Sequence, residues 1–266
     1  MGEVGVAQVD GTVSQQQRRE QIRQDVLAHG HVRIEQLVEE HGVSGMTIHR
    51  DLDLLERQGW LRKIRGGATS TPGSLLARSV GARRSDAADA KARIARHALR
   101  HITSGQVVAI DDSTSGLAVA ELLAPAAPLT VVTNFLPVIN LLSGQDGLHV
   151  IGLGGDYHPG FDAFLGLHAA DMADTLRSDV LLLSTTAVVD GHCLHRSQET
   201  VQVKRALMRT AATRVLLADH SKFERRAVHE LAPLTDFDLV IVDADTPPAV
   251  VEGLRGRGVA VEIAEA

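Results

Sequence analysis

The sequence predicts two domains: an N-terminal α+β winged helix-turn-helix and a C-terminal α/β domain with a mostly parallel sheet. Three short helical patterns and a basic strand fill the chain up to residue 68, and from residue 91 apolar strands alternate with helices. The length of 266 residues is enough for both domains. We therefore place the first domain at residues 13–68, a linker at 69–90 and the second domain at 91–266.

The composition is that of an ordinary globular protein, with 44% hydrophobic and 23% charged residues. No apolar run is long enough to cross a bilayer, and the N-terminus lacks the charged start and apolar stretch of a signal peptide. Cys193 is the one cysteine, so no internal disulfide can form. We expect a cytoplasmic protein, because free thiols persist in a reducing compartment.

The net charge of −6 does not by itself favour a nucleic-acid partner. Residues 13–68, however, hold nearly equal numbers of basic and acidic residues, and the run from Arg57 to Arg65 contains no acidic residue. Charges are screened beyond roughly 10 Å at moderate salt, so local placement matters more than the total. Charge therefore neither supports nor excludes DNA binding.

The third helical pattern of the N-terminal domain has one apolar stripe. Ile48, Leu52 and Leu55 are spaced by four and three residues, and Ser44 before them is a typical N-cap residue. Short helices separated by a brief turn form the skeleton of a helix-turn-helix. The predicted helices span residues 15–29, 33–41 and 44–59. The polar residues expected on or near the other faces of the third helix are Thr47, His49, Arg50 and Asp51.

The segment WLRKIRGGA, residues 60–68, alternates apolar and basic residues before a glycine pair. This pattern predicts a small β-wing. It leaves Arg62, Lys63 and Arg65 available to phosphates or to the minor groove.

Residues 18–68 resemble the DNA-binding end of the DeoR family of bacterial regulators. The most specific part is VSGMTIHRDLDLLERQG, residues 43–59, followed by a basic strand and Gly-Gly-Ala. The resemblance implies that the third helix enters the major groove of a double-stranded operator. His49 stands where the family usually has arginine, which weakens a phosphate contact or changes the operator. The residues expected to contact DNA are Ser44, Thr47, His49 and Arg50 in the groove and Arg65 in the wing.

Residues 69–90 are rich in Ser, Ala and Gly and have no clean periodicity, which is typical of a hinge. We predict no site there. Beyond it, short apolar strands alternate with helices, a pattern that favours a parallel sheet covered on both faces. The predicted strands span residues 106–111, 129–134, 148–155, 178–185, 214–219, 238–243 and 259–265.

Polar residues follow four of these strands where each one ends. In chain order they are 111–116, 133–134, 154–156 and 219–222. Ligands of open α/β sheets bind outside the carboxyl ends of the strands, so we expect a site at this edge. A hydroxyl-rich helix start at 113–115 suits an anion such as phosphate. Lys204 and Lys222 would add positive charge, and Asp111 and Asp219 would accept hydrogen bonds from sugar hydroxyls.

The C-terminal domain also resembles its DeoR counterpart, whose fold is similar to ribose-5-phosphate isomerase and CoA transferases and which typically binds sugar phosphates. The family motifs appear here at 111–115, 133–134, 154–155 and 219–223, with Ser113 in place of a glycine. A side chain there restricts close approach of a ligand to the backbone. The residues expected to bind an effector are Asp111, Ser113, Thr114, Ser115, Thr133, Asn134, Gly154, Gly155, Glu199, Lys204, Asp219 and Lys222.

Residues 190–200 form a polar segment that we interpret as a loop able to cover this site. His192, Cys193 and His195 lie in it, but they lack a fourth ligand and the usual zinc spacing. We therefore predict no metal and no cofactor.

Three functions fit the sequence. The leading one is a repressor of a carbohydrate-metabolism operon, acting as a homodimer or homotetramer and controlled by a small sugar-phosphate-like metabolite. The alternative is a sugar-phosphate isomerase or transferase fused to a DNA-binding module, although fold likeness does not transfer activity. In the third, the second domain only joins copies of the chain.

Overall fold

The computed structural model describes residues 15–57, 61–70 and 80–265. The chain divides into two compact units, residues 1–78 and 79–266, which are described separately below.

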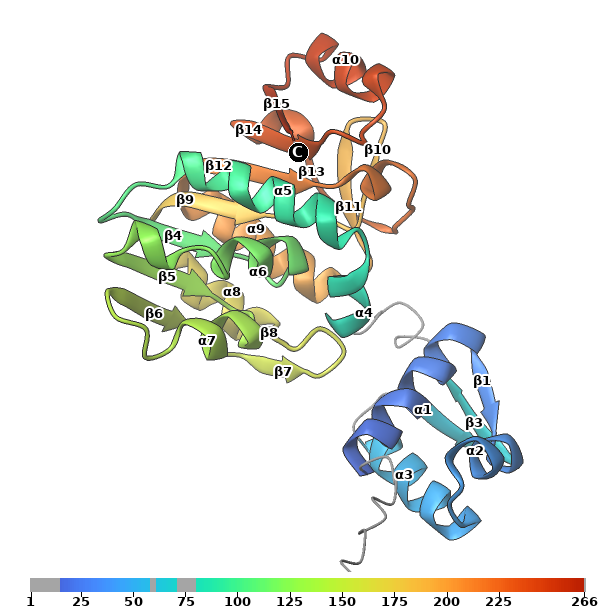
Figure 1. The fold of residues 1–266 in the computed structure, drawn as a ribbon. Coiled ribbons are helices and arrows are strands. Elements are labelled where there is room, and N and C mark those ends of the chain that lie inside the picture. The colour runs from blue at the N-terminus through green and yellow to red at the C-terminus, as the bar shows by residue number, and fades with distance from the viewer. Residues whose placement is uncertain (1–14, 58–60, 71–79, 266) are drawn as a thin grey trace, which may run out of the picture. The chain divides into compact units, whose positions relative to one another are not determined.

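The N-terminal unit combines three helices with a three-stranded antiparallel sheet of order β1-β3-β2 (Figure 1). Its third helix and its β2–β3 wing follow each other as the sequence predicts, whereas the edge strand β1 was not predicted. The elements are α1 (Gln15–His29), β1 (His31–Arg33), α2 (Ile34–His41), α3 (Gly45–Arg57), β2 (Leu61–Ile64) and β3 (Gly67–Ser70).

The core of this unit is built from the predicted helical stripe. Ile48, Leu52 and Leu55 of α3 are buried and pack with Ile22 of α1 and Leu37 of α2. Glycine ends α2 because the position after it is left-handed, with φ of 62°, which Gly adopts without steric cost. The short turn then starts α3 and gives the helix-turn-helix.

The C-terminal unit is centred on a seven-stranded sheet of order β15-β14-β12-β9-β4-β5-β6, parallel throughout. The predicted fold class is therefore confirmed. Its helices are α4 (Val80–Ser85), α5 (Ala88–Ala98), η1 (Leu99–His101), α6 (Thr114–Ala120), η2 (Ala124–Ala126), α7 (Leu136–Leu142), α8 (Leu167–Asp174), α9 (Gln198–Thr210), η3 (His220–Phe223), η4 (Leu234–Asp236) and α10 (Pro248–Gly256). Its strands are β4 (Val107–Ile110), β5 (Leu129–Thr133), β6 (Leu148–Gly152), β7 (Asp156–His158), β8 (Ala163–Leu165), β9 (Ser178–Leu183), β10 (Ala187–Val189), β11 (His192–His195), β12 (Ala211–Ala218), β13 (His229–Pro233), β14 (Leu239–Asp243) and β15 (Val261–Ala264).

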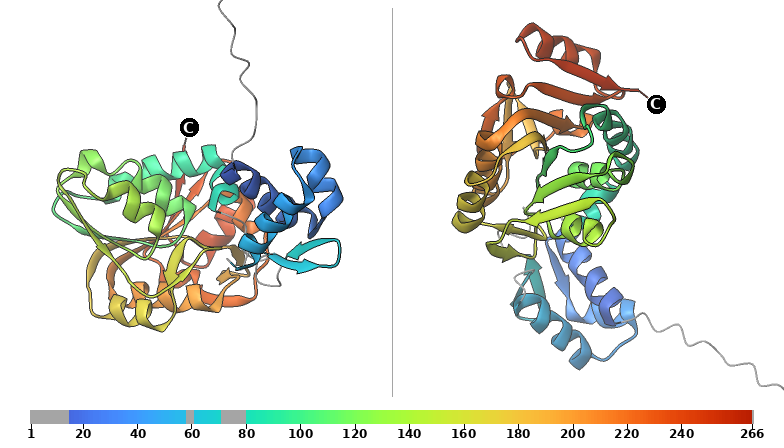
Figure 2. Two further views of the ribbon diagram at one scale, coloured as in Figure 1. Left: turned by 90° about the horizontal axis from the view of Figure 1, so that it is seen from below. Right: turned by 90° about the vertical axis from the view of Figure 1, so that its left-hand side faces the viewer.

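The central strands are continuous apolar runs because both faces of the sheet are covered. Helices α5, α6 and α7 lie on one face, and α8 and α9 lie on the other (Figure 1 and Figure 2). Side chains on both faces of a central strand, such as Leu181, Leu182 and Leu183 of β9, are fully buried. This is the pattern expected of a parallel sheet between two helical layers.

Two small antiparallel sheets were not predicted. Strands β7 and β8 form a hairpin, and β10, β11 and β13 form a three-stranded sheet. The interpretation of 190–200 as a loop is therefore wrong, because this segment contains β11 and the start of α9. Its polar composition hid the strand, since only alternate residues such as Cys193 and His195 face inward.

The predicted linker, 69–90, holds more structure than its composition suggested. Residues 69–70 complete β3, residues 80–85 form α4, and α5 begins at Ala88. The remaining residues, 71–79, lie outside the described part of the chain.

Candidate functional site

The first turn of α3 is capped by its own hydroxyls. The Thr47 amide donates to Ser44 Oγ over 3.2 Å, and the two side-chain oxygens lie 2.9 Å apart. Ser44 is therefore the N-cap that the sequence predicts. A capped, fixed first turn presents its exposed side chains in a defined direction.

The exposed side chains of this turn include both predicted and missed residues. His49 and Arg50 are exposed, and Met46 has 67% of its surface exposed. Among the described residues, no ion pair engages Arg50. Met46 was not predicted, although an exposed apolar residue at this place can contact a thymine methyl group. Its position between the cap and Thr47 could have drawn attention to it.

Asp51 does not lie on a solvent-facing side of α3 as the sequence analysis expected. It is fully buried, and its carboxylate lies 2.7 Å from Arg18 Nε and 2.6 Å from Arg19 Nε. This pair ties α3 to α1. The spacing could have revealed it, because residue 51 falls between Ile48 and Leu55 on the apolar stripe.

The wing uses one of its three cations internally. Lys63 forms an ion pair with Asp53 of α3, and its amide donates to Glu56 Oε1 over 2.7 Å. Lys63 thus holds the wing against the helix. The prediction that it is available to phosphates is therefore wrong. Arg62 and Arg65 remain exposed, the latter next to the turn at Gly66.

In the C-terminal unit, the strand order places the expected polar ends side by side. Strand β4 lies between β5 and β9, so the chain reverses its direction of travel across the sheet at β4. Such a switch point opens a crevice that α/β proteins use for ligands. Four neighbouring strands, β12, β9, β4 and β5, end there. The residues that follow them are Asp219, Ser184, Asp111 and Asn134.

Asp111 is the centre of this cluster. Its carboxylate accepts hydrogen bonds from the amides of Ser113 over 3.1 Å and Ser184 over 2.7 Å, and it pairs with Lys204. Asp111 and these three partners are all buried. Burial alone lowers the pKa of Lys204, but Asp111 and the neighbouring Asp112 outweigh it and raise that pKa above its ordinary value. Lys204 is thus committed to the two carboxylates.

Asp112 was not predicted, and it is the less satisfied carboxylate. It lies 3.1 Å from Lys204 Nζ, an ion-pair contact, yet neither of its oxygens accepts an aligned hydrogen bond from the described residues. Burial raises the pKa of Asp112, but Lys204, His195 and Arg83 together hold it below its usual value. A buried carboxylate is therefore held ionised with hydrogen-bonding capacity left over.

His195 lies against this carboxylate from β11. Burial, and then Lys204, lower the pKa of its ring to about 3, so the imidazole is neutral at physiological pH. Its Nδ1 lies 3.2 Å from the Ser197 amide, and its ring centroid is 6.1 Å from that of Phe161. No local sequence pattern marked His195 as a binding residue; the pairing of β11 with β10 brings it here.

Arg83 enters the cluster from α4. Its guanidinium donates to the main-chain oxygens of Asp112 and Phe161, each over 3.3 Å, while Nε has no described partner. Burial lowers its pKa, against the opposing effect of nearby carboxylates. Thr114 Oγ1 in turn donates to the Arg83 carbonyl over 3.2 Å. An arginine from the segment we interpreted as a site-free hinge thus joins the site.

Lys91 of α5 fixes the turn between α4 and α5. Its ammonium donates to the carbonyls of Arg83 and Asp86, and burial lowers its pKa to about 8. The Asp86 carboxylate lies 3.1 Å from Arg225. These contacts hold the C-terminal end of α4 and the turn that follows it.

The fourth strand end contributes Asp219 and Lys222. Asp219 accepts from the Ser221 amide over 3.1 Å, and its other oxygen is 3.5 Å from Lys222 Nζ without an aligned hydrogen bond. Burial lowers the pKa of Lys222, partly offset by Asp219. Both residues thus lie in the cluster, and their ion pair is long and lacks a hydrogen bond.

The predicted hydroxyl run at the start of α6 is buried but already engaged. Ser113 Oγ accepts from the Gly116 amide over 2.9 Å as the N-cap, and Thr114 donates to Arg83. Ser115 is buried too. The hydroxyls here chiefly order the loop, which was expected to offer them to an anion.

The other predicted residues divide into two groups. Asn134 is buried and donates to the Phe164 carbonyl over 3.0 Å, but its Oδ1 has no partner among the described residues, while Thr133 accepts from the Phe135 amide. Gly154, Gly155 and Glu199 are exposed. A side chain at 155 would come within 2.7 Å of the Leu165 carbonyl, so this glycine serves packing against β8. The Glu199 carboxylate accepts a hydrogen bond from the Ser197 hydroxyl over 2.8 Å, away from the cluster around Asp111.

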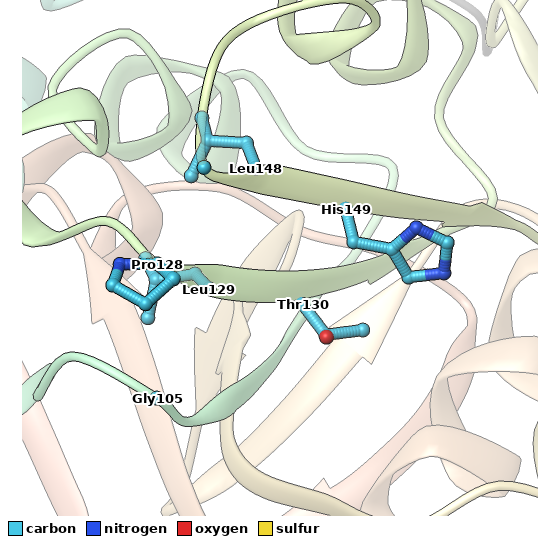
Figure 3. Close-up of a pocket in the computed structure, with 7 residues that line it drawn as sticks. Gly105, Pro128, Leu129, Thr130, Leu148 and His149 are labelled. Atoms are coloured by element: carbon cyan, nitrogen blue, oxygen red, sulfur yellow. The ribbon is translucent and has the colours of Figure 1, made fainter.

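A hollow at the opposite end of the strands differs chemically from this cluster. It encloses about 420 Å³ where β5 and β6 begin, between Gly105, Pro128 and Thr130 on one side and Leu148 and His149 on the other (Figure 3). No lysine, arginine or carboxylate lines it. It therefore lacks the charges of the strand-end cluster.

Two domain families match this chain. The DeoR-like helix-turn-helix domain matches residues 18–72, and the DeoR C terminal sensor domain matches residues 86–244. The chain belongs to the DeoR family. It is thus a transcription regulator with a helix-turn-helix and a sensor domain. Among the described residues, no helix is long and apolar enough to cross a membrane.

Curated DeoR-family relatives match along nearly their full length. The glycerol-3-phosphate regulon repressor of Escherichia coli strain K12 is 31% identical over 94% of this chain and 100% of its own. The L-fucose operon activator of Haemophilus influenzae is 30% identical over 86% of this chain and 92% of its own. The lactose phosphotransferase system repressor of Staphylococcus epidermidis is 30% identical over 85% and 91%. The relatives are transcription regulators.

Solved structures show more distant likeness. Ribose 5-phosphate isomerase A of Methanocaldococcus jannaschii aligns with 51% of this chain and 54% of its own, at 13% identity and a TM-score of 0.38. A Pyrococcus horikoshii translation initiation factor, eIF-2B, aligns with 87% and 90%, at 11% identity and a TM-score of 0.42. Similarity at this level supports no conclusion about activity.

Proposed function

We propose that this DeoR-family protein represses a carbohydrate-metabolism operon and is released from its operator by a small phosphorylated sugar or polyol. The effector would bind at the carboxyl ends of β4, β9, β12 and β5. The repressor role is supported by the names of relatives such as the glycerol-3-phosphate regulon repressor.

The observation that carries this proposal is the set of buried polar atoms at the strand ends that make no aligned hydrogen bond with the described residues. Buried polar atoms are costly unless something satisfies them, so a buried group with no partner points to a ligand. Asp112, Asn134 and Asp219 each have a carbonyl or carboxylate oxygen in this state among the described residues. These acceptors match the hydroxyl groups of a sugar or polyol.

The cationic side chains of the same cluster favour binding of an anion. Arg83 donates only to main-chain carbonyls, and Lys222 lies 3.5 Å from its carboxylate. A phosphate would give both groups charge-assisted hydrogen bonds. Lys204 is a weaker candidate for this contact because Asp111 and Asp112 already hold it. A ligand with an anionic end and several hydroxyls satisfies both sets of atoms.

Arg83 also offers a route by which an effector could act on DNA binding. Helix α4 is the first described element of the sensor unit and follows residues 71–79, which lead from the DNA-binding unit. If phosphate draws the guanidinium away from the Asp112 and Phe161 carbonyls, α4 loses two of its anchors. Ligand occupancy would then bias the segment that joins the two units.

We further propose that the effector is bound and not converted. The Ser184 hydroxyl donates to the Leu217 carbonyl over 2.7 Å, and burial raises the pKa of the Cys193 thiol to about 12. His195, with a pKa of about 3, is too weak a base at neutral pH. The alternative, a sugar-phosphate isomerase or transferase, requires turnover of a compound such as ribose 5-phosphate.

The proposed partners are a double-stranded operator and a second copy of the chain in the cytoplasm. Helix-turn-helix proteins usually read two half-sites, which a homodimer or homotetramer supplies. Sedimentation of the free protein and of its operator complex would distinguish these states from a monomer.

The decisive experiment measures operator release by defined phosphorylated compounds. An operator is first selected in vitro from random duplexes, and binding is followed by fluorescence anisotropy. Glycerol 3-phosphate, other sugar phosphates, their unphosphorylated parents and inorganic phosphate are then added in turn. We expect a phosphorylated polyol or sugar to release the DNA and to raise the melting temperature, while its parent does neither. If none of these compounds changes either signal, the proposed effector class is wrong.

A further inference from the structure

A second cluster in the sensor unit lies away from the strand-end site and has the composition of a transition-metal site. His97 of α5 and His101 of η1 are four residues apart, so both rings project from the same side of one continuous helical segment. Glu262 of β15 reaches them from the edge of the sheet. The Nε2 atoms of the two rings lie 2.7 and 2.8 Å from the same carboxylate oxygen of Glu262.

The three side chains are held in place before any ion arrives. The side chain of His97 is 12% exposed, that of His101 is 30% and that of Glu262 is 42%. The two rings are 6.2 Å apart and inclined by 36°, so they are not stacked on each other. Little conformational freedom remains to be lost on binding, while the carboxylate stays within reach of water.

No described arginine or lysine forms an ion pair with Glu262. Glutamate side chains are ordinarily ionised at neutral pH, as a carboxylate ligand of a metal must be. The charge of Glu262 is matched only by imidazoles, which are themselves metal ligands when neutral.

The three ligand atoms lie within 4.8 Å of one another, near enough for one small divalent ion to reach them all. Zinc binds histidine nitrogen and carboxylate oxygen at about 2.0–2.2 Å, which sets tetrahedral ligands roughly 3.4 Å apart. The Nε2 and Oε2 atoms therefore need to separate by only about 0.6 Å, a small rotation of a partly exposed glutamate. Three protein ligands leave one position for water.

The two other histidine- or acid-rich clusters of the described residues fit less well. His220, Asp243 and Asp245 come together beyond β12 and β14, but Arg93 lies 3.5 Å from Asp243 and pairs with Asp245. The Arg93 guanidinium already neutralises these carboxylates, so a metal ion would have to displace it. Asp25, Glu40 and His41, in the N-terminal unit, contain one imidazole against two carboxylates, and Asp25 has a partner already.

We propose that His97, His101 and Glu262 bind Zn²⁺ or a similar borderline divalent ion and so clamp β15 to α5. Strand β15 is the edge of the sheet and is paired with β14 alone. A metal bridge to α5 would give this strand a second attachment. The inference departs from the absence of metal predicted by the sequence, in which Glu262 is 161 residues from His101. It is independent of the effector proposed above.

The test is direct titration of Zn²⁺ into tag-free, chelator-treated full-length protein, with a competing chromophoric chelator. We expect one ion per chain at this site. Binding should weaken by at least roughly 10-fold in His101→Gln and in Glu262→Gln, since even outer-shell changes cost that much. His168→Gln, at an exposed histidine of α8, is the matched control and should bind as the wild type does.

Two further readouts separate a site from incidental binding. Co²⁺ should give the visible absorption of a tetrahedral complex in the wild type and in His168→Gln, but not in Glu262→Gln. Zn²⁺ should raise the melting temperature of the wild type more than that of Glu262→Gln. The proposal is overturned if the wild type binds no Zn²⁺, or if His101→Gln and Glu262→Gln bind it unchanged.

Discussion

The guanidinium of Arg83 lies 3.3 Å from the main-chain oxygen of Asp112 and also contacts the Phe161 carbonyl. Arg83 is half-buried, and among the described residues its guanidinium donates to carbonyl groups and has no carboxylate at ion-pair distance, so its positive charge is not neutralised by an ion pair. The same residue belongs to α4, which follows the segment between the two units. Arg83 is therefore placed both to contact an anion and to alter the start of the sensor unit.

We predict that Arg83→Gln weakens the response to the phosphorylated effector. Loss of a charge-assisted hydrogen bond should reduce effector affinity by roughly 10- to 100-fold. Operator affinity without effector should stay within a few-fold of the wild type, and operator release should need correspondingly more compound. Thermal shift measures the first effect and anisotropy measures the second.

The matched control is the neighbouring arginine. Arg84 is exposed and pairs with Glu121, outside the cluster. Arg84→Gln should keep both affinity and release. If the effector releases the wild type from its operator, and Arg83→Gln binds the effector and is released just as well, Arg83 has no part in the site. In that case the proposed class of effector still holds.

Arg50→Ala should weaken selective operator binding without affecting the sensor unit. The side chain is exposed on the first turns of α3, where a recognition helix reads base edges. Removing a base-contacting arginine typically costs roughly 10- to 100-fold in affinity and relaxes the sequence preference at one position. Competition between selected and random duplexes measures this directly.

Arg57→Ala is the control for charge alone, since Arg57 lies exposed in the last turn of the same helix. Arg57→Ala should weaken binding to selected and random duplexes by the same factor, and this factor should be smaller than the loss caused by Arg50→Ala. Equal selectivity of the wild type and Arg50→Ala would show that another part of α3 reads the bases.

Local patterns were enough to predict the helices and parallel strands. The stripe of Ile48, Leu52 and Leu55 and the apolar run of β9 each record burial in their own periodicity. The strand-end principle also predicted that Asp111, Asp219 and Lys222 lie at one edge of the sheet, as they do in the structure. It needs only the positions where strands end, and not which strands are neighbours.

Residues brought in by tertiary structure could not be predicted in this way. Ser184 joins the site because β9 pairs with β4, and His195 joins it because β11 folds back against β10. Arg83 lay in a segment without periodicity, so nothing local marked its burial. Asp51 is different: its spacing was visible, but the usual preference of aspartate for solvent concealed it.

Asp51→Ala should destabilise the N-terminal unit strongly. Asp51 is buried and contacts both Arg18 and Arg19, so its removal leaves a buried arginine without its counter-charge. Breaking such a pair costs about 3 kcal/mol or more. Amide hydrogen exchange of the full-length protein should then speed up by roughly 100-fold in peptides from α1 and α3. Asp53→Ala, which removes only the exposed pair with Lys63, should leave exchange nearly unchanged.

Cys193 should be unreactive in the native protein at any pH near neutrality. It is fully buried on β11, and burial raises the pKa of its thiol to about 12, so at pH 8 only about one molecule in ten thousand carries a thiolate. Iodoacetamide should label the protein only after unfolding in urea. Rapid labelling of the folded protein would contradict the burial of β11.

The same shift in pKa sets the sign of a pH effect on stability. In the unfolded chain the thiol ionises near its ordinary pKa of about 8.5, while in the folded chain it stays protonated. The unfolded state therefore loses its proton first, and the contribution of Cys193 to stability is complete below about pH 8.5 and declines as the pH rises toward 12. Urea unfolding of the wild type and of Cys193→Ala at pH 7 and at higher pH checks this. The advantage of the wild type over the variant should shrink at the higher pH, whereas an unchanged or larger advantage would show that the folded thiol ionises as readily as the unfolded one.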